Sequence, residues 1–425
     1  MDDHKGEEGM KEEESRGAPR GYFPYPKEWL DAESEGIAES VKRWADLELI
    51  GKRLQFRENF EHQMKSFKVL AADMGLHGLI WPVDLGGTGF PLPGASSTLV
   101  RVYEEIGRAD PGIGYVSAVN VALAAALLEE EAADDELKAR VAPAFCGDGD
   151  IQLFSLVLPG LGTAGGEPRT ILSGREVQAV VRGDGDGWLL SAEGARPINS
   201  GYNASVYAVI ASTPDGLGIA FVDADAEGVE RGELLKTTGL SVSLNADVTF
   251  NRVRLAKNAV VPIRSGFFRN LSAWIRLLAA AVAIGSAMDV YAIVRDWADN
   301  RIIKGKGLLR DNPMDAAVLA QVAMDIVESR SLVHSLARAV AIPGGFGIET
   351  SEDLYIMSGI LSVRVLENCM HAVNRAMELM ASAGYAREWH VEKHWRDLKT
   401  MQVYIGGRTP VEMEVAGYYF GSDII

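Results

Sequence analysis

The sequence reads MASAGY at residues 380–385, VEKHWRDLK at residues 391–399 and VYIGGRTP at residues 403–410. Long segments with the composition of helices precede these three motifs, at residues 271–298, 316–340 and 354–383. The first of these segments is rich in alanine and leucine and contains no proline, which would interrupt a helix. We therefore predict that residues 265–425 form a helical bundle domain that ends with the three motifs.

The residue pattern changes from helical to strand-like over residues 151–264. Short runs that are β-branched or alternate apolar and polar residues occur at 178–181, 188–191, 206–211, 218–222 and 248–250. Turn-forming residues separate these runs, as in RGDGDG at residues 182–187. Several short strands with such turns between them predict a compact antiparallel β domain in the middle of the chain.

Residues 22–150 are predicted to form an N-terminal helical domain. Phe67, Leu70, Ala71 and Met74 recur at the i, i+3, i+4, i+7 spacing that places apolar side chains on one face of a helix. Residues 1–21 are rich in Asp, Glu, Lys and Gly, so we expect them to form a disordered charged arm. No apolar segment follows that arm, which argues against a secretory signal and favours a cytoplasmic location.

Composition and spacing argue against several kinds of partner. The 425 residues include 42 Lys and Arg against 59 Asp and Glu, a net charge of −17, whereas nucleic-acid binding requires clustered basic side chains. The apolar run at residues 277–284 is shorter than the ~20 residues that span a membrane. Cys146 and Cys369 are far apart, so we expect both to be reduced and buried. His390 and His394 lie one helical turn apart, but no acidic third ligand accompanies them, so we expect a helix surface and no metal site.

In this order the motifs resemble the acyl-CoA dehydrogenase family, whose C-terminal domain usually reads GGxGY, then PVERxxRDxK, then IYEGT. Two further segments fit the resemblance. WPVDLGGTG at residues 81–89 is similar to the family's PEExGGxG loop, and PINSG at residues 197–201 stands where the family has WITNG. The resemblance implies an α+β fold with helical, β and helical domains and assembly as a dimer of dimers. It also implies FAD as cofactor, acyl-CoA as substrate and electron-transfer flavoprotein as a partner.

The resemblance places the family's catalytic base at one of two positions. Most members remove the α-proton of the acyl thioester with the Glu of YEGT, and the matching residue here is Ile405. Other members use the position just before an Arg of the first bundle helix, and the matching residue here is Ile275. An aliphatic side chain cannot accept a proton, so we expect no catalytic residue at either position.

Three carboxylates could replace the missing base: Glu378, Glu412 and Glu414. Glu412 ends the sequence Thr409-Pro410-Val411-Glu412, which has the pattern of a capping box with proline at the first helical position. A structural role therefore accounts for Glu412, and no sequence feature singles out the other two. The run at residues 391–399 is expected to pack and form salt bridges between subunits.

The resemblance also implies which residues bind ligands. Arg276 matches an Arg that contacts coenzyme A in relatives. Arg301 matches an Arg that binds the FAD pyrophosphate of the neighbouring subunit, a task that suits the donors of a guanidinium. Thr163, Asn199 and Gly384 keep a hydroxyl, a donor group and a glycine at further positions that contact FAD in relatives.

Other flavin contacts of the family are lost in this sequence. Where relatives have Thr, Trp, Phe, Gln and two glycines, this chain has Val157, Pro197, Lys304, Glu378, Ala381 and Ser382. The glycines allow the backbone to approach the ADP part of the cofactor, so the side chains of Ala381 and Ser382 should crowd it. The added carboxylate of Glu378 is unfavourable near a diphosphate.

These losses support three hypotheses about function. The first is a subunit without a base in a heteromeric α2β2 acyl-CoA dehydrogenase, whose homologous partner carries the Glu and holds or shares the FAD. Such enzymes resemble those known in bacterial steroid and alicyclic-acid breakdown. The second is a homomeric flavoprotein with altered chemistry, of the desulfinase or monooxygenase type, which needs no base for an α-proton. The third is an acyl-CoA-binding homologue without flavin or activity.

Overall fold

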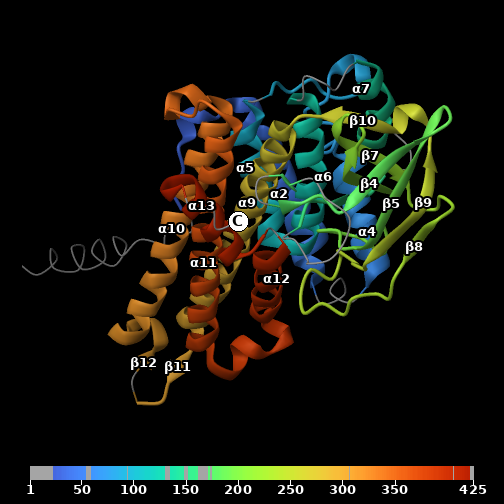
Figure 1. Cartoon of the computed structure of the whole chain (residues 1–425). Coiled ribbons are helices and arrows are strands. Elements are labelled where there is room, and N and C mark those ends of the chain that lie inside the picture. Colours follow the sequence, from blue (N-terminus) through green and yellow to red (C-terminus); the bar gives the residue numbers. More distant parts are fainter. Residues whose placement is uncertain are drawn as a thin grey trace, which may run out of the picture.

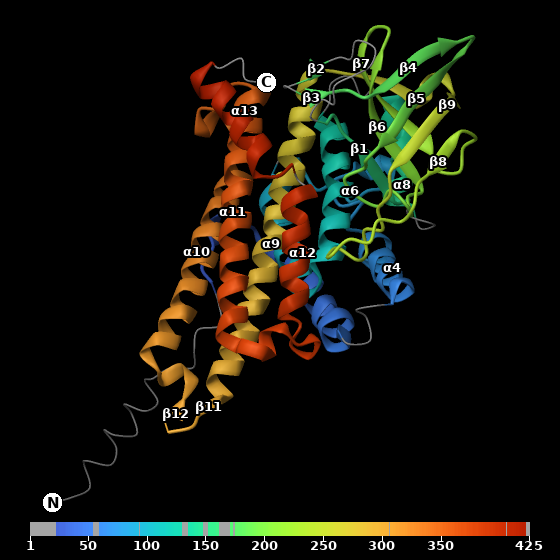
Figure 2. The same ribbon diagram turned by 60° about the horizontal axis from the view of Figure 1, so that its bottom comes forward.

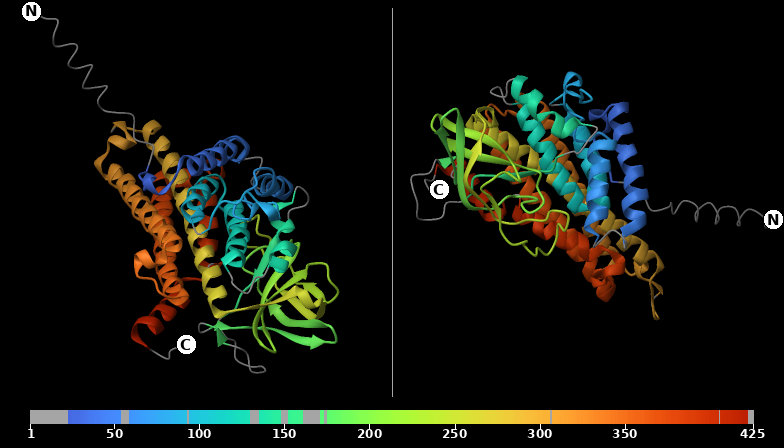
Figure 3. Two further views of the ribbon diagram at one scale, coloured as in Figure 1. Left: turned by 90° about the horizontal axis from the view of Figure 1, so that it is seen from above. Right: turned by 90° about the vertical axis from the view of Figure 1, so that its right-hand side faces the viewer.

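Helices from both ends of the chain pack together, and a sheet from its middle lies at one side of them (Figures 1 and 3). The computed structural model describes residues 23–53, 59–92, 94–129, 135–147, 152–160, 171–172, 175–305, 307–404 and 406–421. The expected charged arm, residues 1–21, lies outside the described residues, as do Thr163 and Ile405. The arrangement agrees with the predicted α+β fold.

The N-terminal part is helical, as predicted. Its helices are α2 (Ala32–Trp44), α4 (Phe60–Lys68), α5 (Ala95–Ala109), α6 (Pro111–Glu129), α7 (Asp135–Val141) and α8 (Pro143–Cys146). Asp31 and Asn59 begin α2 and α4 because each side chain accepts a hydrogen bond from a backbone N–H of the first turn. The predicted apolar stripe is confirmed, since Phe67, Leu70 and Ala71 are buried in the core.

The sheet is mixed, which differs from the purely antiparallel sheet that the sequence suggested. Its strands are β1 (Phe154–Val157), β4 (Ala179–Asp184), β5 (Gly187–Ala195), β6 (Val206–Thr213), β7 (Gly216–Asp223), β8 (Val229–Arg231), β9 (Val248–Leu255) and β10 (Val260–Ile263). They lie in the order β10-β7-β6-β4-β5-β9-β8, and β1 pairs with β6. The β4–β5 and β6–β7 pairs are antiparallel, whereas β6 pairs in parallel with β1 and β4. Only strands joined by a short turn must be antiparallel, so the parallel pairs are not visible in the local sequence.

The C-terminal part is the predicted helical bundle. It contains α9 (Ser265–Asn300), the hairpin β11 (Ile302–Ile303) and β12 (Gly307–Leu308), α10 (Pro313–Ala341), α11 (Ser351–Met380), α12 (Val391–Tyr404) and α13 (Arg408–Phe420). The three long helices begin a few residues earlier than expected, and polar caps explain this for α10 and α11. Asn312 caps α10, and Thr350 with Asp353 forms a capping box at α11.

Helix α9 is the centre of the core. It crosses α5 closely at two glycines: a Cβ on Gly285 would lie 1.9 Å from the carbonyl oxygen of Glu104, and one on Gly107 would lie 2.1 Å from that of Val282. Helices α6 and α9 are long and apolar enough to cross a membrane by length and composition. Most of each apolar stretch is buried inside the protein, so both are core helices.

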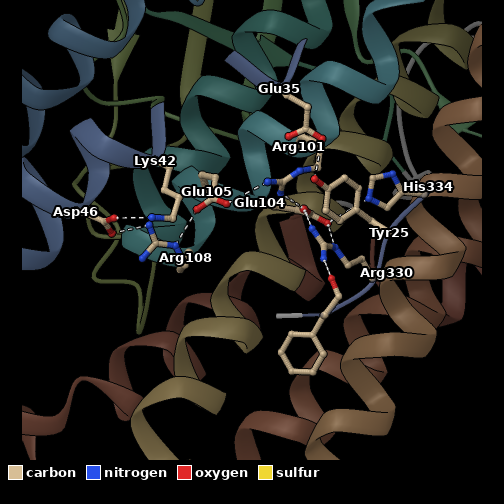
Figure 4. A network of polar contacts seen from close by, with 11 residues as sticks. Tyr25, Glu35, Lys42, Asp46, Arg101, Glu104, Glu105, Arg108, Arg330 and His334 are labelled. Carbon is tan, nitrogen blue, oxygen red and sulfur yellow. Dashed lines mark hydrogen bonds and ion pairs between the residues drawn. The ribbon is translucent and has the colours of Figure 1, made fainter. Parts of the chain in front are cut away.

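A buried charge network joins α5 to α10 (Figure 4). Glu104 of α5 accepts hydrogen bonds from Arg330 at 2.8 and 2.6 Å and from Arg101 at 2.5 Å. The ring centre of Tyr25 lies 4.7 Å from the guanidinium carbon of Arg101 and 4.5 Å from that of Arg330. Burial acts to raise the pKa of Glu104, but Arg330 and His334 outweigh it and hold this pKa well below its usual range. The network fixes the segment before α2 onto the two helices.

Helix α12 connects the three parts of one chain. Lys393 forms ion pairs with Asp110 at 2.9 Å and with Asp397 at 2.6 Å. Asp397 in turn accepts the backbone N–H of Leu240 at 2.7 Å. A Cβ on Gly239 would lie 2.2 Å from the carbonyl oxygen of Arg396, so only glycine permits this approach. These contacts of the 391–399 run lie within the chain, and its expected contacts with another subunit stay a prediction.

Candidate functional site

A small cavity lies where β3 (Arg175–Glu176), α9 and α11 meet. Its volume is about 60 Å³. Its walls include Arg175, Ile198, Ile275, Arg276, Tyr355 and Tyr404. Ile275 and Arg276, which are far from Tyr404 in the sequence, therefore share one site, as the resemblance implied. Ile405 follows Tyr404 directly in the chain but lies outside the described residues.

Arg276 is buried against α11. Its Nη1 donates to the carbonyl oxygen of Tyr355 at 2.7 Å, and its guanidinium lies 4.2 Å above the ring of the same residue. Its Nη2 lies 3.3 Å from a carboxylate oxygen of Glu414. The side chain is therefore fixed in place by α11 and α13 together.

Glu414 of α13 is the centre of a polar cluster beside the cavity. Its Oε1 accepts hydrogen bonds from Arg175 Nε at 2.8 Å and from the Tyr355 hydroxyl at 2.7 Å. Burial raises the pKa of Tyr355, although Arg276 and Arg175 lower it. Burial lowers the pKa of Arg175, but Tyr355 and Glu414 outweigh this and raise it. At neutral pH the cluster thus contains a neutral phenol and a charged guanidinium.

The described walls of the cavity include no carboxylate. Ile275 lines the cavity at one of the family's two base positions. Glu414 lies behind Arg175, Arg276 and Tyr355 and is bound to all three, which leaves it poorly placed to approach a ligand in the cavity. The described residues therefore provide no group here that could remove a proton from carbon.

The other two candidate carboxylates lie away from the cavity. Glu412 is exposed and pairs with Arg408 at 2.6 Å. The predicted capping box was wrong, because α13 begins at Arg408 and its N-cap, Gly407, has no side chain to bond. Glu378 is exposed near the far end of α11, about 35 Å from Tyr355 at 1.5 Å per residue. It pairs there with Arg375.

The predicted cofactor residues do not gather at the cavity. Arg301 ends α9, about 37 Å from Arg276 along the same helix. It is exposed, its guanidinium lies 5.4 Å from the ring centre of Trp297, and among the described residues no carboxylate pairs with it. The turn at Ala381–Tyr385, which contains Gly384, directly follows α11 at the same end of the bundle (Figure 2). A Cβ on Gly384 would lie 2.5 Å from the carbonyl oxygen of Met377, so this position needs glycine for packing.

Asn199 lies near the cavity but its side chain bonds to the sheet. Its Oδ1 accepts the N–H of Leu156 at 3.1 Å, and its Nδ2 donates to the carbonyl oxygen of Phe154 at 2.8 Å. Asn199 therefore holds its neighbour Ile198, which lines the cavity, close to strand β1. Its contact with FAD, like that of Thr163, remains a prediction.

Ala381, which stands where relatives have glycine, has a backbone conformation that glycine adopts readily. It follows α11 with φ +50° and ψ −132°, a conformation that side chains disfavour. Ser382 has no positive φ. This backbone conformation costs about 1–3 kcal/mol with an alanine side chain.

His394 is buried, so the expected helix surface was wrong for this residue. Its Nδ1 lies 2.7 Å from the hydroxyl of Ser286 and its Nε2 lies 3.0 Å from Asp289. Within the described part of the chain, no group of three or more His, Cys, Asp or Glu side chains is arranged to hold a metal ion. Cys369 is buried as expected, whereas Cys146 is only partly buried.

Sequence reasoning missed two members of the cluster, Arg175 and Tyr355. Neither belongs to a motif, and each is far in sequence from Glu414, which was noted only as a carboxylate in the same region. No spacing pattern could have found them, because β3, α11 and α13 meet only in the folded chain.

Comparisons with known proteins agree with this architecture. Residues 31–148 match the model of the acyl-CoA dehydrogenase N-terminal domain, and residues 277–408 match a model of its C-terminal domain. The chain is 24% identical to the mitochondrial short-chain specific acyl-CoA dehydrogenase of Bos taurus, over 96% of both chains. It is also 24% identical to a probable acyl-CoA dehydrogenase of Bacillus subtilis, over 89% of this chain and 94% of that protein.

Two solved structures have the same fold. Butyryl-CoA dehydrogenase of Megasphaera elsdenii superposes with a TM-score of 0.75 at 19% identity, covering 92% of this chain and 99% of the other. Glutaryl-CoA dehydrogenase of Mycobacterium smegmatis in complex with FADH2 superposes with a TM-score of 0.77 at 17% identity, covering 93% and 96%. At these identities the likeness shows the fold alone.

Proposed function

The chain belongs to the acyl-CoA dehydrogenase family, and on this basis we propose that it is the subunit without a catalytic base in a heteromeric α2β2 enzyme. That enzyme would dehydrogenate an acyl-CoA thioester between its α and β carbons. A homologous subunit with the Glu would carry the chemistry, and electron-transfer flavoprotein would accept the electrons. A cytoplasmic location is part of the same proposal.

The observation that carries the proposal is the absence of a carboxylate from the described walls of the cavity at Arg276. The α-proton of a thioester is only weakly acidic, so its removal needs a carboxylate placed over the carbon. Ile275 cannot serve, and Ile405 is aliphatic as well. Glu414 is bonded to two arginines and a tyrosine and does not line the cavity.

FAD is the cofactor of the family, and the chain keeps part of what would hold it. The exposed guanidinium of Arg301 suits a diphosphate oxygen. Ala381 has the positive φ that favours glycine, the residue that relatives have there, and this is consistent with a turn that contacts the cofactor. FAD, when bound, supplies a hydride acceptor for the β-hydrogen.

The distance between the two ends of α9 also supports a shared site. Arg276 and Arg301 lie about 37 Å apart on one continuous helix, so the coenzyme A expected at Arg276 and the FAD diphosphate expected at Arg301 would bind at two separate places on this chain. If Arg301 binds FAD, it does so in a site that another subunit completes. A chain can then lose its own base and still contribute Arg301 to a partner.

The test is the visible spectrum and mass of the protein, expressed alone and then together with the products of neighbouring genes. A colourless chain that forms a yellow complex with a Glu-bearing homologue is the expected result. A chain that is yellow alone, with one FAD per subunit, would overturn the proposal and favour altered flavin chemistry. A chain that binds acyl-CoA but stays free of flavin with every neighbour would favour the non-enzymatic role.

A further inference from the structure

The charges around the cavity do not balance. Arg175 and Arg276 contribute two guanidinium groups to its walls, and Glu414 behind them contributes one carboxylate. Among the described residues, Glu414 is the only carboxylate that forms an ion pair with Arg175 or Arg276, and the phenol of Tyr355, whose pKa is raised by burial, is neutral. A mostly buried site is therefore left with one positive charge in excess.

An excess charge in such a place favours a ligand of opposite sign. Burial weakens the solvation of a guanidinium, and only a hydrogen-bonded counter-ion compensates for this well. Glu414 uses Oε1 for Arg175 and Tyr355, and Oε2 lies 3.3 Å from Arg276, which is longer than an ideal charge-assisted bond. The single carboxylate is thus divided between two arginines.

The walls leave Arg175 accessible to a ligand on the cavity side. Gly406 lines the same cavity with φ +112°, and a Cβ built on it would lie 3.6 Å from Nη2 of Arg175. Glycine at this position leaves the space beside the guanidinium free of a side chain. The cavity volume of about 60 Å³ equals roughly two water molecules at about 30 Å³ each, which suits a compact polar group.

We propose that this cavity is a carboxylate-binding site, in which one compact carboxylate of a ligand lies beside Arg175 and Arg276. The planar fork of a guanidinium matches a carboxylate, and a single negative charge balances the excess. A phosphate carries up to two negative charges, which is more than the single excess positive charge of the site. The site does not depend on flavin or on a catalytic base, so it goes beyond the proposed function.

The ligand carboxylate has two possible sources, a free small acid or the acidic end of an acyl-CoA. Isothermal titration of the full-length chain at constant ionic strength distinguishes them with four probes: sodium succinate, succinyl-CoA, butyryl-CoA and inorganic phosphate. Binding of succinate and succinyl-CoA shows the shared chemistry, and binding of only one of them identifies the source. Equal or tighter binding of butyryl-CoA or phosphate would overturn the proposal.

Substitutions in the cluster should shift the affinity in opposite directions. Arg175→Met removes the excess charge and should weaken binding of the carboxylate by about tenfold or more, whereas Arg175→Lys should retain part of it. Glu414→Gln leaves the second arginine without a counter-ion and should strengthen binding several-fold. The matched control is Arg254→Met, because Arg254 is an exposed arginine of the middle strands.

The opposite signs separate a binding role from a structural one. If the cluster only holds β3 against α11 and α13, both Arg175→Met and Glu414→Gln should weaken any binding or leave it unchanged, and the proposal fails. Should Glu414→Gln not fold, the comparison of Arg175→Met, Arg175→Lys and wild type still decides, since equal affinities in all three would contradict the site. Failure of all four probes to bind also contradicts it, whatever the flavin spectrum of the complex shows.

Discussion

The two ends of the C-terminal bundle differ in how their charged groups are satisfied (Figure 2). At the cavity end, Arg276 is buried and bonds to Tyr355 and Glu414 of the same chain. At the other end, Arg301 is exposed with a ring beneath it, and Ala381 holds a strained backbone. The first end is complete within one chain, whereas the second is arranged like a surface that a partner or cofactor completes.

The contrast indicates that Arg276 stabilises the fold, whereas Arg301 is free to bind a ligand. A buried ion pair is fixed by folding, and its loss leaves an uncompensated charge. An exposed arginine contributes little to folding and can be retained for binding alone. Substitutions at the two ends should therefore have opposite effects on folding and on ligand binding.

Ile405→Glu supplies a carboxylate at the family's usual base position. In an FAD-containing complex whose partner subunit has its own catalytic Glu replaced by Gln, it should raise dehydrogenation of an acyl-CoA by about 10²–10⁴-fold, the usual contribution of a general base. Turnover with an artificial electron acceptor measures this, and Ile405→Gln is the control of matched size without a base. No gain with FAD bound would show that the site has diverged beyond the loss of one carboxylate.

Arg276→Met should destabilise the cavity end. It leaves Glu414 with one arginine in a buried site, and we expect a loss of about 3 kcal/mol in the free energy of unfolding, measured by urea denaturation. The exposed Arg254→Met serves as control and should stay within about 0.5 kcal/mol of wild type. An equally small change for Arg276→Met would mean that the buried cluster is not what holds this end together.

Arg301→Met should have the opposite profile at the far end. The free energy of unfolding should change by less than about 0.5 kcal/mol, because the side chain is exposed. The affinity of the assembled complex for FAD should fall about tenfold, through the loss of a charged contact to the diphosphate. Flavin retention during dilution measures this. Unchanged retention would remove the main evidence for a shared cofactor site.

Ala381→Gly should stabilise the chain by about 1 kcal/mol, because glycine adopts a positive φ without strain. Thermal unfolding of the variant measures the effect. Ser382→Gly is the neighbouring control and should bring no gain, since Ser382 has no positive φ and glycine only adds freedom to the unfolded chain. A gain at Ser382 and none at Ala381 would show that the strain at this end is not at the turn.

Much of the fold could be predicted from the sequence because its signals are local. The long helices α9, α10 and α11 appear as proline-free apolar runs, and the main strands appear between turn residues. Helices α10 and α11 begin a few residues before the predicted apolar segments, because Asn312 and Thr350 cap them there. The parallel pairing of β6 with β1 and β4 had no local signal, because it joins strands that are distant in the chain.

Some features of the candidate site were likewise predictable from the sequence, and others were not. The sequence by itself determined the family, the aliphatic residues Ile275 and Ile405 at the base positions, and the retention of Arg276 and Arg301. Only the tertiary structure decided that Arg175 and Glu414 meet Arg276 at the cavity, that Glu378 is remote from it, and that Arg301 lies at the opposite end. The physical reason is that identity at a motif position is a property of the chain, whereas ion pairing, burial and excess charge depend on which distant segments the fold brings into contact.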